Sequence, residues 1–478
     1  MRVAFVDRIG WDYRPDTVYR EPLGGSQSAV CYLTAALAQR GVTVALVNHT
    51  TQEGEVLGVS CHHAERLPER FWQNFDAVVL FNESGLGLVL REALMEASAP
   101  HPGPQLILWT QHDTNQPAMQ ALHDRLERTV YDRFVLVSEW QRQQYLQVFG
   151  LESARTQVLR NAIAPSLERL PAIGEKEPLV VYTSTPFRGL AELLSLWPAI
   201  HRDFPQARLE VFSSLKVYRQ SEAEDRAYFG ELYDRCQQLP GVAYRGSIPQ
   251  PELAQVLQRA LILAYPNTFP ETSCIAVLEA LAAGCHVVTS ALGALPETTG
   301  GWATLIAPGP TYGAQFVAAV GQILREAEAG RPHRDRQSAQ TKADHTWARR
   351  AAQWEAWLRE VCQPEALPEE EEERAQAHER RLQFEAAAAI REERYERCPE
   401  DWANIYALAR DYRAAGYGWS ESWPYLQEAM VAAPTNPEIL WQMALAWEAI
   451  GDPETAERYW QEAIALCPGL AVLRGAQN

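Results

Sequence analysis

Two glutamates have the residue type and the spacing for a site that binds hydroxyl groups. Glu271 lies in a predicted loop, and Glu279 lies eight residues later in a predicted helix. Between them, the amides of Thr272, Ser273 and Cys274 are predicted to open the helix, where unpaired N–H groups favour an anion. The segment therefore offers an acceptor, an anion site and a second acceptor. A nucleotide sugar presents sugar hydroxyls, a diphosphate and a ribose diol in that order.

The elements that must position these acids are a strand, a loop and a helix. Residues 261–265 form an apolar run closed by prolines, which predicts a buried parallel strand. A helix is predicted over residues 273–283, because apolar residues recur at helical spacing and a glycine ends the pattern. Residues 286–289 predict the next strand. The alternative is a buried amphipathic helix with one capping acid and one surface acid.

The stretch PETSCIAVLEALAAGCHVV, residues 270–288, resembles the E-x7-E motif of retaining family 4 glycosyltransferases. Thr272-Ser273 replaces the usual Phe-Gly after the first glutamate. The resemblance covers residues 1–361 and implies a GT-B fold, in which two Rossmann-like domains face a cleft. It implies a retaining, metal-independent transfer from a nucleoside-diphosphate sugar to an acceptor hydroxyl. Under it, Glu271 accepts from the sugar hydroxyls and Glu279 from the ribose.

Strand and helix signals alternate over most of the chain, which predicts the α/β class with two doubly wound parallel sheets. We predict an acceptor domain over residues 1–165, a nucleotide-sugar domain over 166–345, a crossover helix over 346–362 and an all-α repeat domain over 363–478. The main predicted strands are 3–6, 42–47, 77–81, 106–109, 134–137, 158–163, 179–182, 209–215, 261–265 and 286–289, and a helix is predicted over 28–40.

Two features of the predicted N-terminal domain lie at the carboxyl ends of strands, where such sheets bind ligands. Gly24-Gly25 precedes the helix over 28–40 and resembles the family's Gly-Gly loop, which faces the diphosphate and the acceptor; a plain turn is the alternative. His112 follows the strand over 106–109 and resembles the family's histidine that contacts the donor sugar near the reacting centre. The alternative is a loop histidine with satisfied hydrogen bonds.

Basic residues of the second predicted domain are candidates for binding the diphosphate. The resemblance matches Arg188-Gly189 to the family's Lys-Gly pair, while Thr183-Ser184 stands where the family has an earlier arginine. Hydroxyls and amides such as those of Ser184, or the side chain of Lys216, would then take its place. Fixed cations stabilise the charge that develops on a leaving diphosphate. Surface salt bridges are the alternative for both cations. Ser247 and Ile248 resemble a turn that reads the base through its backbone.

The C-terminal residues carry a repeat pattern. Residues 436–468 resemble a 34-residue tetratricopeptide repeat, a looser copy precedes it, and helices before Cys398 are expected to supply a third pair. The repeats predict either a structural cap or dimer contact, or the capture of an extended peptide or protein partner. Residues 364–368, with the acidic run after them, are expected to separate this region from the rest.

Composition limits the partners and the compartment. A net charge of −18 argues against nucleic acid and anionic membranes as partners. Scattered cysteines, an N-terminal strand and the lack of a long apolar run predict a cytoplasmic protein without a transmembrane segment. We expect no metal site, and a surface loop at His62-His63. No cofactor is expected; the nucleotide sugar is a substrate, a UDP-sugar ahead of a GDP-sugar, and the acceptor is a glycan, a lipid-linked glycan or a protein.

Two other classes of function stay open. One is a scaffold whose repeats bind a partner and whose glycosyltransferase half is degenerate. The other is a GT-B epimerase or phosphorylase. A pyridoxal-dependent phosphorylase would need a lysine, for which only Lys216 or Lys342 is placed.

Overall fold

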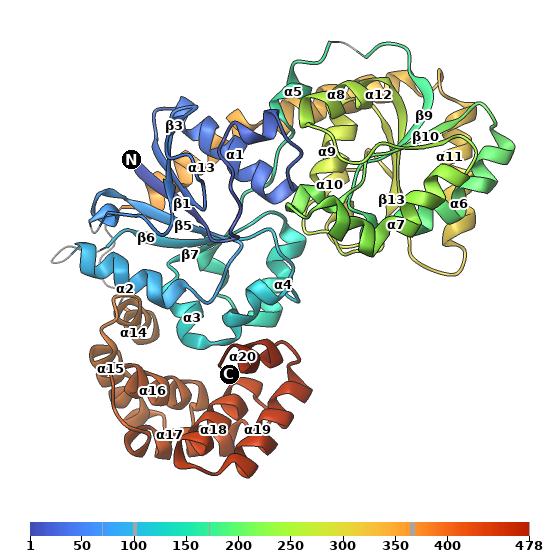
Figure 1. Cartoon of the computed structure of the whole chain (residues 1–478). Helices are drawn as coiled ribbons and strands as arrows, with labels where there is room; N and C mark the ends of the chain where they lie inside the picture. The colour runs from blue at the N-terminus through green and yellow to red at the C-terminus, as the bar shows by residue number, and fades with distance from the viewer. Residues whose placement is uncertain (69, 99–102, 172, 364–368, 478) are drawn as a thin grey trace. The chain divides into compact units, whose positions relative to one another are not determined.

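The structure, a computed structural model, describes residues 1–68, 70–98, 103–171, 173–363 and 369–477 (Figure 1). The chain divides into two compact units. Unit 1 contains Met1–Arg66, Val135–Gln144 and Gln157–Leu358, and unit 2 contains Leu67–Phe134, Tyr145–Thr156 and Arg359–Asn478. The domain boundaries predicted at residues 165, 345 and 362 stay a prediction. The break predicted at residues 364–368 lies outside the described residues.

The first sheet has eight strands in the order β3-β4-β2-β1-β5-β6-β7-β8. β1 and β2 pair in parallel, as do β2 and β4, and β5 and β6, whereas β3 and β4 form an antiparallel pair. The strands are nearly all buried where they are apolar, as expected for a parallel sheet. Their bounds are β1 Arg2–Asp7, β2 Thr43–Asn48, β3 Gly54–Val56, β4 Val59–His63, β5 Ala77–Phe81, β6 Gln105–Trp109, β7 Arg133–Leu136 and β8 Thr156–Val158.

Two predictions in this sheet are wrong. His62-His63 belongs to β4, where it pairs with Val47 and Asn48 of β2, and not to a surface loop. The strand predicted over 158–163 ends at Val158. Asn161 and Ile163, which are buried, make their backbone contacts outside the sheet: the Ile163 N–H donates to the His345 carbonyl, and Arg350 donates to the Asn161 carbonyl.

The second sheet has six parallel strands in the order β11-β10-β9-β12-β13-β14. The central strand β12 is completely buried, as its apolar run predicts. The predicted strands 179–182, 261–265 and 286–289 are confirmed. The bounds are β9 Glu177–Tyr182, β10 Arg208–Val211, β11 Val242–Tyr244, β12 Ala260–Tyr265, β13 His286–Ser290 and β14 Thr304–Ile306.

Helices connect and cover these strands, as expected for alternating strand and helix units. Those before the C-terminal region are α1 Gly25–Gln39, α2 Gly87–Ser98, α3 Arg125–Val130, α4 Glu139–Phe149, α5 Pro165–Glu168, α6 Leu190–Asp203, α7 Glu222–Gln238, α8 Gln250–Arg259, α9 Ile275–Ala282, α10 Leu295–Thr299, α11 Tyr312–Arg325, α12 Arg331–Asp344 and α13 Trp347–Val361. The predicted Trp-rich helix corresponds to α13, in which Trp347 and Trp354 are buried.

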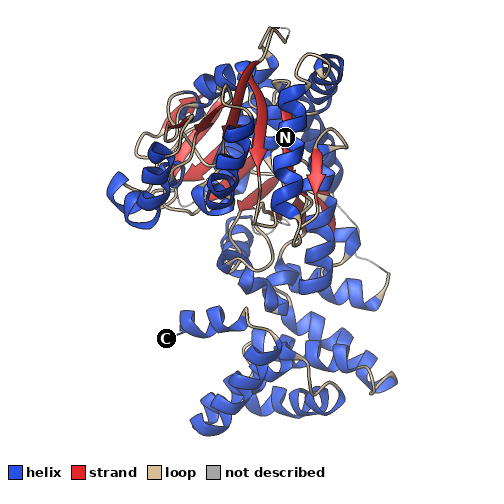
Figure 2. Ribbon diagram, turned by 90° about the vertical axis from the view of Figure 1, so that its right-hand side faces the viewer, coloured by secondary structure: helices blue, strands red, loops and turns tan. Residues whose placement is uncertain are grey.

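The described part of the C-terminal region is all-helical, as predicted (Figure 2). Its helices are α14 Glu371–Arg380, α15 Phe384–Arg397, α16 Trp402–Ala414, α17 Trp419–Ala432, α18 Pro437–Ile450, α19 Pro453–Leu466 and α20 Leu470–Gln477. Ile405, Leu426 and Met443, from three successive helices, share one buried apolar cluster. The assignment of these helices to tetratricopeptide repeats stays a prediction.

Candidate active site

An ion pair joins two of the predicted site residues. Arg188 Nη1 lies 2.8 Å from both carboxylate oxygens of Glu271. The Glu271 side chain is 4% exposed and the Arg188 side chain 24% exposed. The guanidinium also lies over the Phe269 ring, 4.8 Å from its centroid. The two side chains therefore form one fixed, largely buried charge pair.

Strand adjacency explains why these two side chains meet. Arg188 follows β9 and Glu271 follows β12, and the two strands are parallel neighbours in the second sheet. The carboxyl ends of parallel strands lie at one edge of a sheet, so the loops that follow them are brought together. Arg188 lies in the 3₁₀ turn Pro186–Arg188, and Gly189 after it is the N-cap of α6.

Two further contacts hold Glu271, and neither was predicted from the sequence. The Tyr265 hydroxyl donates to Glu271 Oε1 at 2.5 Å, and the Ala294 N–H donates to the Glu271 carbonyl at 2.7 Å. Gly293 has φ +58°, and a Cβ added there would lie 2.6 Å from the Glu271 carbonyl oxygen. The signal for Tyr265 is a polar aromatic residue at the carboxyl end of the strand. Ser184 joins this cluster, because its hydroxyl donates to the Tyr265 hydroxyl at 3.3 Å.

The helix after Glu271 begins later than predicted. α9 starts at Ile275 rather than Ser273, and its N-cap, Cys274, has extended backbone angles. Thr272 and Ser273 therefore belong to the loop that follows Glu271, whose backbone is held by the Ala294 bond. The binding of a diphosphate by the amides of Thr272, Ser273 and Cys274 stays a prediction.

Glu279 lies in the middle of α9 and is 5% exposed. Its Oε1 accepts a hydrogen bond from the Ala164 N–H at 3.2 Å. Burial raises the pKa of this carboxyl to about 7, and the hydrogen bond from Ala164 opposes the shift. A buried acid that titrates near neutrality is a frequent mark of a functional site.

The Gly24-Gly25 loop lies against the start of α9 and against the turn Leu215–Tyr218. α1 begins at Gly25, three residues before the predicted start, and Gly24 is its N-cap. A Cβ added at Gly25 would lie 3.6 Å from the side chain of Ile275, the first residue of α9. The Gly24 N–H donates to the Val217 carbonyl at 3.0 Å. Lys216, which is exposed, precedes that carbonyl in the turn Leu215–Tyr218, so the structure brings it near the glycine loop.

Three other predicted residues have surroundings of their own. Ser247 and Ile248 are half-buried in the loop after β11. The buried Ser247 hydroxyl has no hydrogen-bond partner among the described residues. His112 belongs to unit 2, where its carbonyl accepts from the Tyr145 hydroxyl at 2.9 Å. The roles of Ser247, Ile248 and His112 stay predictions.

Glu297 of α10 is a further acid, and it was not selected from the sequence. α4 begins at Glu139, and the Glu297 carboxylate accepts from the N–H groups of Glu139 and Trp140, each at 3.1 Å. Arg160 pairs with the same carboxylate at 2.6 Å. A carboxylate at a helix start satisfies its unpaired amides. The first turn of α4 is therefore already occupied by a group of this chain.

Gly189→Ala is expected to displace the Arg188 loop. Gly189 has φ +126°, and an added Cβ would lie 2.2 Å from the Pro266 carbonyl oxygen, so the backbone must move. We expect at least about 2 kcal/mol of lost stability and a tenfold loss of affinity for UDP, on the order seen for strained backbone substitutions. Thermal unfolding and calorimetry measure both. Gly41→Ala is the matched control, since Gly41 also has positive φ, +85°, but nothing within 4 Å of the added atom, and it lies outside the proposed nucleotide site.

No cluster of three or more His, Cys, Asp or Glu side chains is placed to bind a metal ion in the described ranges. Within the same residues, no helix combines the length and the apolar character that crossing a membrane requires.

The segment that contains these site residues matches a known protein family. Residues 177–326, which contain Arg188, Glu271 and Glu279, match the family described as glycosyl transferases group 1. Glycogen synthase of Mycobacterium tuberculosis is 24% identical over 220 residues, which are 45% of this chain and 51% of that protein. The chain thus matches about half the length of this curated relative.

Solved structures show the same fold. Sucrose-phosphate synthase from Thermosynechococcus elongatus aligns with a TM-score of 0.55 and 18% identity, over 76% of this chain and 99% of that one. Anabaena Alr3699/HepE in complex with UDP-glucose aligns with a TM-score of 0.53 and 14% identity, over 75% of this chain and all of that one. The chain therefore has the GT-B fold, and its residues 177–326 match the glycosyl transferases group 1 family.

Proposed function

We propose that the chain is a retaining, metal-independent glycosyltransferase that moves a sugar from a nucleoside-diphosphate sugar to an acceptor hydroxyl. The observation that carries the proposal is the buried Arg188–Glu271 pair in the segment that matches the glycosyltransferase family. A cation and an acceptor held together suit a ligand with an anionic diphosphate next to sugar hydroxyls. The complex of Alr3699/HepE with UDP-glucose supports a UDP-sugar as the first donor to test.

We assign different roles to the two residues of the charge pair. Arg188 stabilises the charge that develops on the leaving diphosphate, and Glu271 accepts hydrogen bonds from the sugar hydroxyls. Glu271 also fixes the guanidinium before the donor arrives, so little reorganisation is needed during transfer. The Arg188 Nε is buried without a hydrogen-bond partner among the described residues, which leaves a donor for a phosphate oxygen.

The other predicted residues complete the proposed site. Glu279 accepts from the ribose hydroxyls, and the amides of Thr272 to Cys274 and of Gly25 contact the diphosphate, with Lys216 adding charge. His112 supports the sugar near the reacting carbon.

The leaving phosphate oxygen accepts the proton of the acceptor hydroxyl, the C–O bond to the phosphate breaks, and the new glycosidic bond forms on the same face. Residues 1–165 bind the acceptor, residues 166–345 bind the donor, and a tetratricopeptide-like region over 363–478 binds a partner in the cytoplasm.

Incubation with a panel of UDP- and GDP-sugars tests the proposal. We expect slow hydrolysis of one donor in the absence of an acceptor, with release of the nucleoside diphosphate and a sugar of unchanged anomeric configuration by NMR. Addition of EDTA is expected to leave the rate unchanged. If neither binding nor hydrolysis of any donor is detected, the chain is a scaffold and the proposal is wrong. Inversion at the sugar, or full loss with EDTA, would contradict the mechanism alone.

A further inference from the structure

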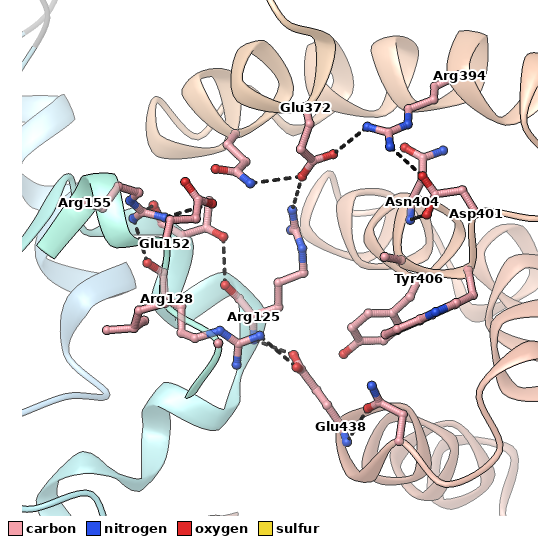
Figure 3. Close-up of a pocket in the computed structure, with 17 residues that line it drawn as sticks. Arg125, Arg128, Glu152, Arg155, Glu372, Arg394, Asp401, Asn404, Tyr406 and Glu438 are labelled. Atoms are coloured by element: carbon pink, nitrogen blue, oxygen red, sulfur yellow. Dashed lines mark hydrogen bonds and ion pairs between the residues drawn. The ribbon is translucent and has the colours of Figure 1, made fainter. Parts of the chain in front are cut away.

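A pocket of about 400 Å³ lies entirely within unit 2 (Figure 3). Its walls come from α3 and residues 150–155 on one side, and from the helices α14, α15, α16 and α18 of the C-terminal region on the other. None of its lining residues belongs to the proposed transfer site. The pocket is therefore separate from the residues to which the proposed function assigns the donor and the transfer step.

The charges that line the pocket balance one another. Four arginines and four carboxylates contribute, and each arginine has an acidic partner among the described residues. The pairs are Arg128–Glu438 at 2.9 Å, Arg394–Asp401 at 2.6 Å, Arg125–Glu372 at 3.8 Å and Arg155–Glu152 at 4.0 Å. With its charges already paired, the pocket has no excess charge with which to select an anion or a cation.

Some neutral polar atoms of the wall are buried and unsatisfied. Tyr406 is 4% exposed and Asn404 is 2% exposed, yet the Tyr406 hydroxyl and Asn404 Oδ1 have no hydrogen-bond partner among the described residues. Figure 3 shows the Tyr406 hydroxyl directed toward the side where Arg128 pairs with Glu438. Buried polar groups without partners cost stability unless water or a ligand satisfies them. A ligand with hydroxyl groups could satisfy both atoms, because it can donate to Asn404 Oδ1 and either donate to or accept from the Tyr406 hydroxyl.

Trp402 gives the pocket an apolar surface. It opens α16, lines the pocket and is 38% exposed, which is high for so large an apolar ring. An exposed aromatic face beside paired charges and unsatisfied neutral groups suits a ligand that has C–H faces and several hydroxyls. The volume lies near the lower end of about 300–1,000 Å³ for small-molecule sites.

We propose that this pocket binds one or two sugar units of a neutral glycan. The ring of Trp402 packs against the C–H face of a sugar, and Tyr406 and Asn404 exchange hydrogen bonds with its hydroxyls. The compact pocket and its paired charges favour this ligand over an extended peptide, which would need a longer groove. The inference concerns binding only, and it holds whether or not the transfer site is active.

Binding of the full-length protein to a printed array of neutral and acidic glycans tests the proposal, with a peptide array as a second arm. We expect neutral glycans to be retained, and acidic glycans and peptides not to be. Calorimetry with the best neutral glycan then measures the affinity. The absence of any neutral glycan from the bound set, or selective binding of peptides, would overturn the proposal.

Three variants connect the binding to the pocket. Trp402→Ala is expected to weaken binding at least tenfold, because the stacking surface is lost. Tyr406→Phe is expected to weaken it about threefold to tenfold without lowering the melting temperature, since the hydroxyl it removes has no protein partner. The control Tyr228→Ala removes an aromatic ring that is 74% exposed and outside the pocket, and should change nothing. Unchanged binding in both pocket variants would refute the assignment, and donor hydrolysis should persist in all three.

Discussion

Glu271→Gln is expected to lower the transfer rate about 10²-fold while leaving the affinity for UDP unchanged or slightly higher. Gln keeps the shape of the side chain but removes the charge that holds Arg188 Nη1 at 2.8 Å. The loss of a preorganised transition-state contact typically costs this much in rate. The affinity for UDP is retained because the guanidinium released from Glu271 is free to pair with the diphosphate.

The same substitution should also destabilise the protein by about 2 kcal/mol. Removal of one partner leaves an unpaired charge in a largely buried place, although the 24% exposure of the Arg188 side chain reduces the cost. Single-turnover kinetics, calorimetry with UDP and urea unfolding give the three quantities. The exposed Glu222→Gln is the matched control. A parallel loss of UDP affinity and transfer rate would show that Glu271 binds the nucleotide and not the sugar.

Glu279→Gln is expected to make the protein more stable and its donor binding weaker. Burial raises the pKa of Glu279 to about 7 from an ordinary value of 4.5. The folded state therefore binds the proton more tightly than the unfolded state, and stability falls as the pH rises from about 4.5 to about 7. At pH 8 the ionised carboxylate costs as much as about 3 kcal/mol, which Gln removes while still accepting from the Ala164 N–H.

Urea unfolding at two pH values tests this prediction. The gain in stability should be largest at pH 8 and vanish near pH 4.5, and UDP affinity should fall about tenfold or more because a charged acceptor to the ribose is lost. In the native protein, UDP affinity should fall as the pH drops through about 7, and the variant should lack this dependence. A variant that binds UDP as tightly as the native protein at pH 8 would exclude the ribose role.

The sequence predicts the parts of this site better than their connections. Arg188, Glu271 and Glu279 could be chosen from their strand–loop–helix context, and the strands that position them are confirmed. The Arg188–Glu271 pair could not be read from a separation of 83 residues. It follows from the adjacency of β9 and β12, which depends on the strand order of the whole sheet.

The other differences have physical causes of the same kind. α9 begins two residues late because the backbone of Glu271 is tied to Ala294 across the Gly293 turn, which no local pattern reveals. Glu297 caps α4 from a distant segment, although Glu139 is the acid nearest to that helix start in the sequence. The pocket in unit 2 is built from segments between residues 125 and 438, so periodicity alone does not indicate it.

In the proposed donor site, the bond from the Gly24 N–H to the Val217 carbonyl limits what the glycine loop contributes to nucleotide affinity. A phosphate oxygen that accepts from the Gly24 N–H must displace the Val217 carbonyl oxygen. The gain in binding free energy is then only the difference between two hydrogen bonds. Affinity for the donor therefore depends little on the glycine loop and more on groups such as Glu279, to which the ribose supplies a hydrogen-bond donor. Mutations in the turn Leu215–Tyr218 should accordingly change the rate of nucleotide entry more than the ranking of nucleotides by affinity.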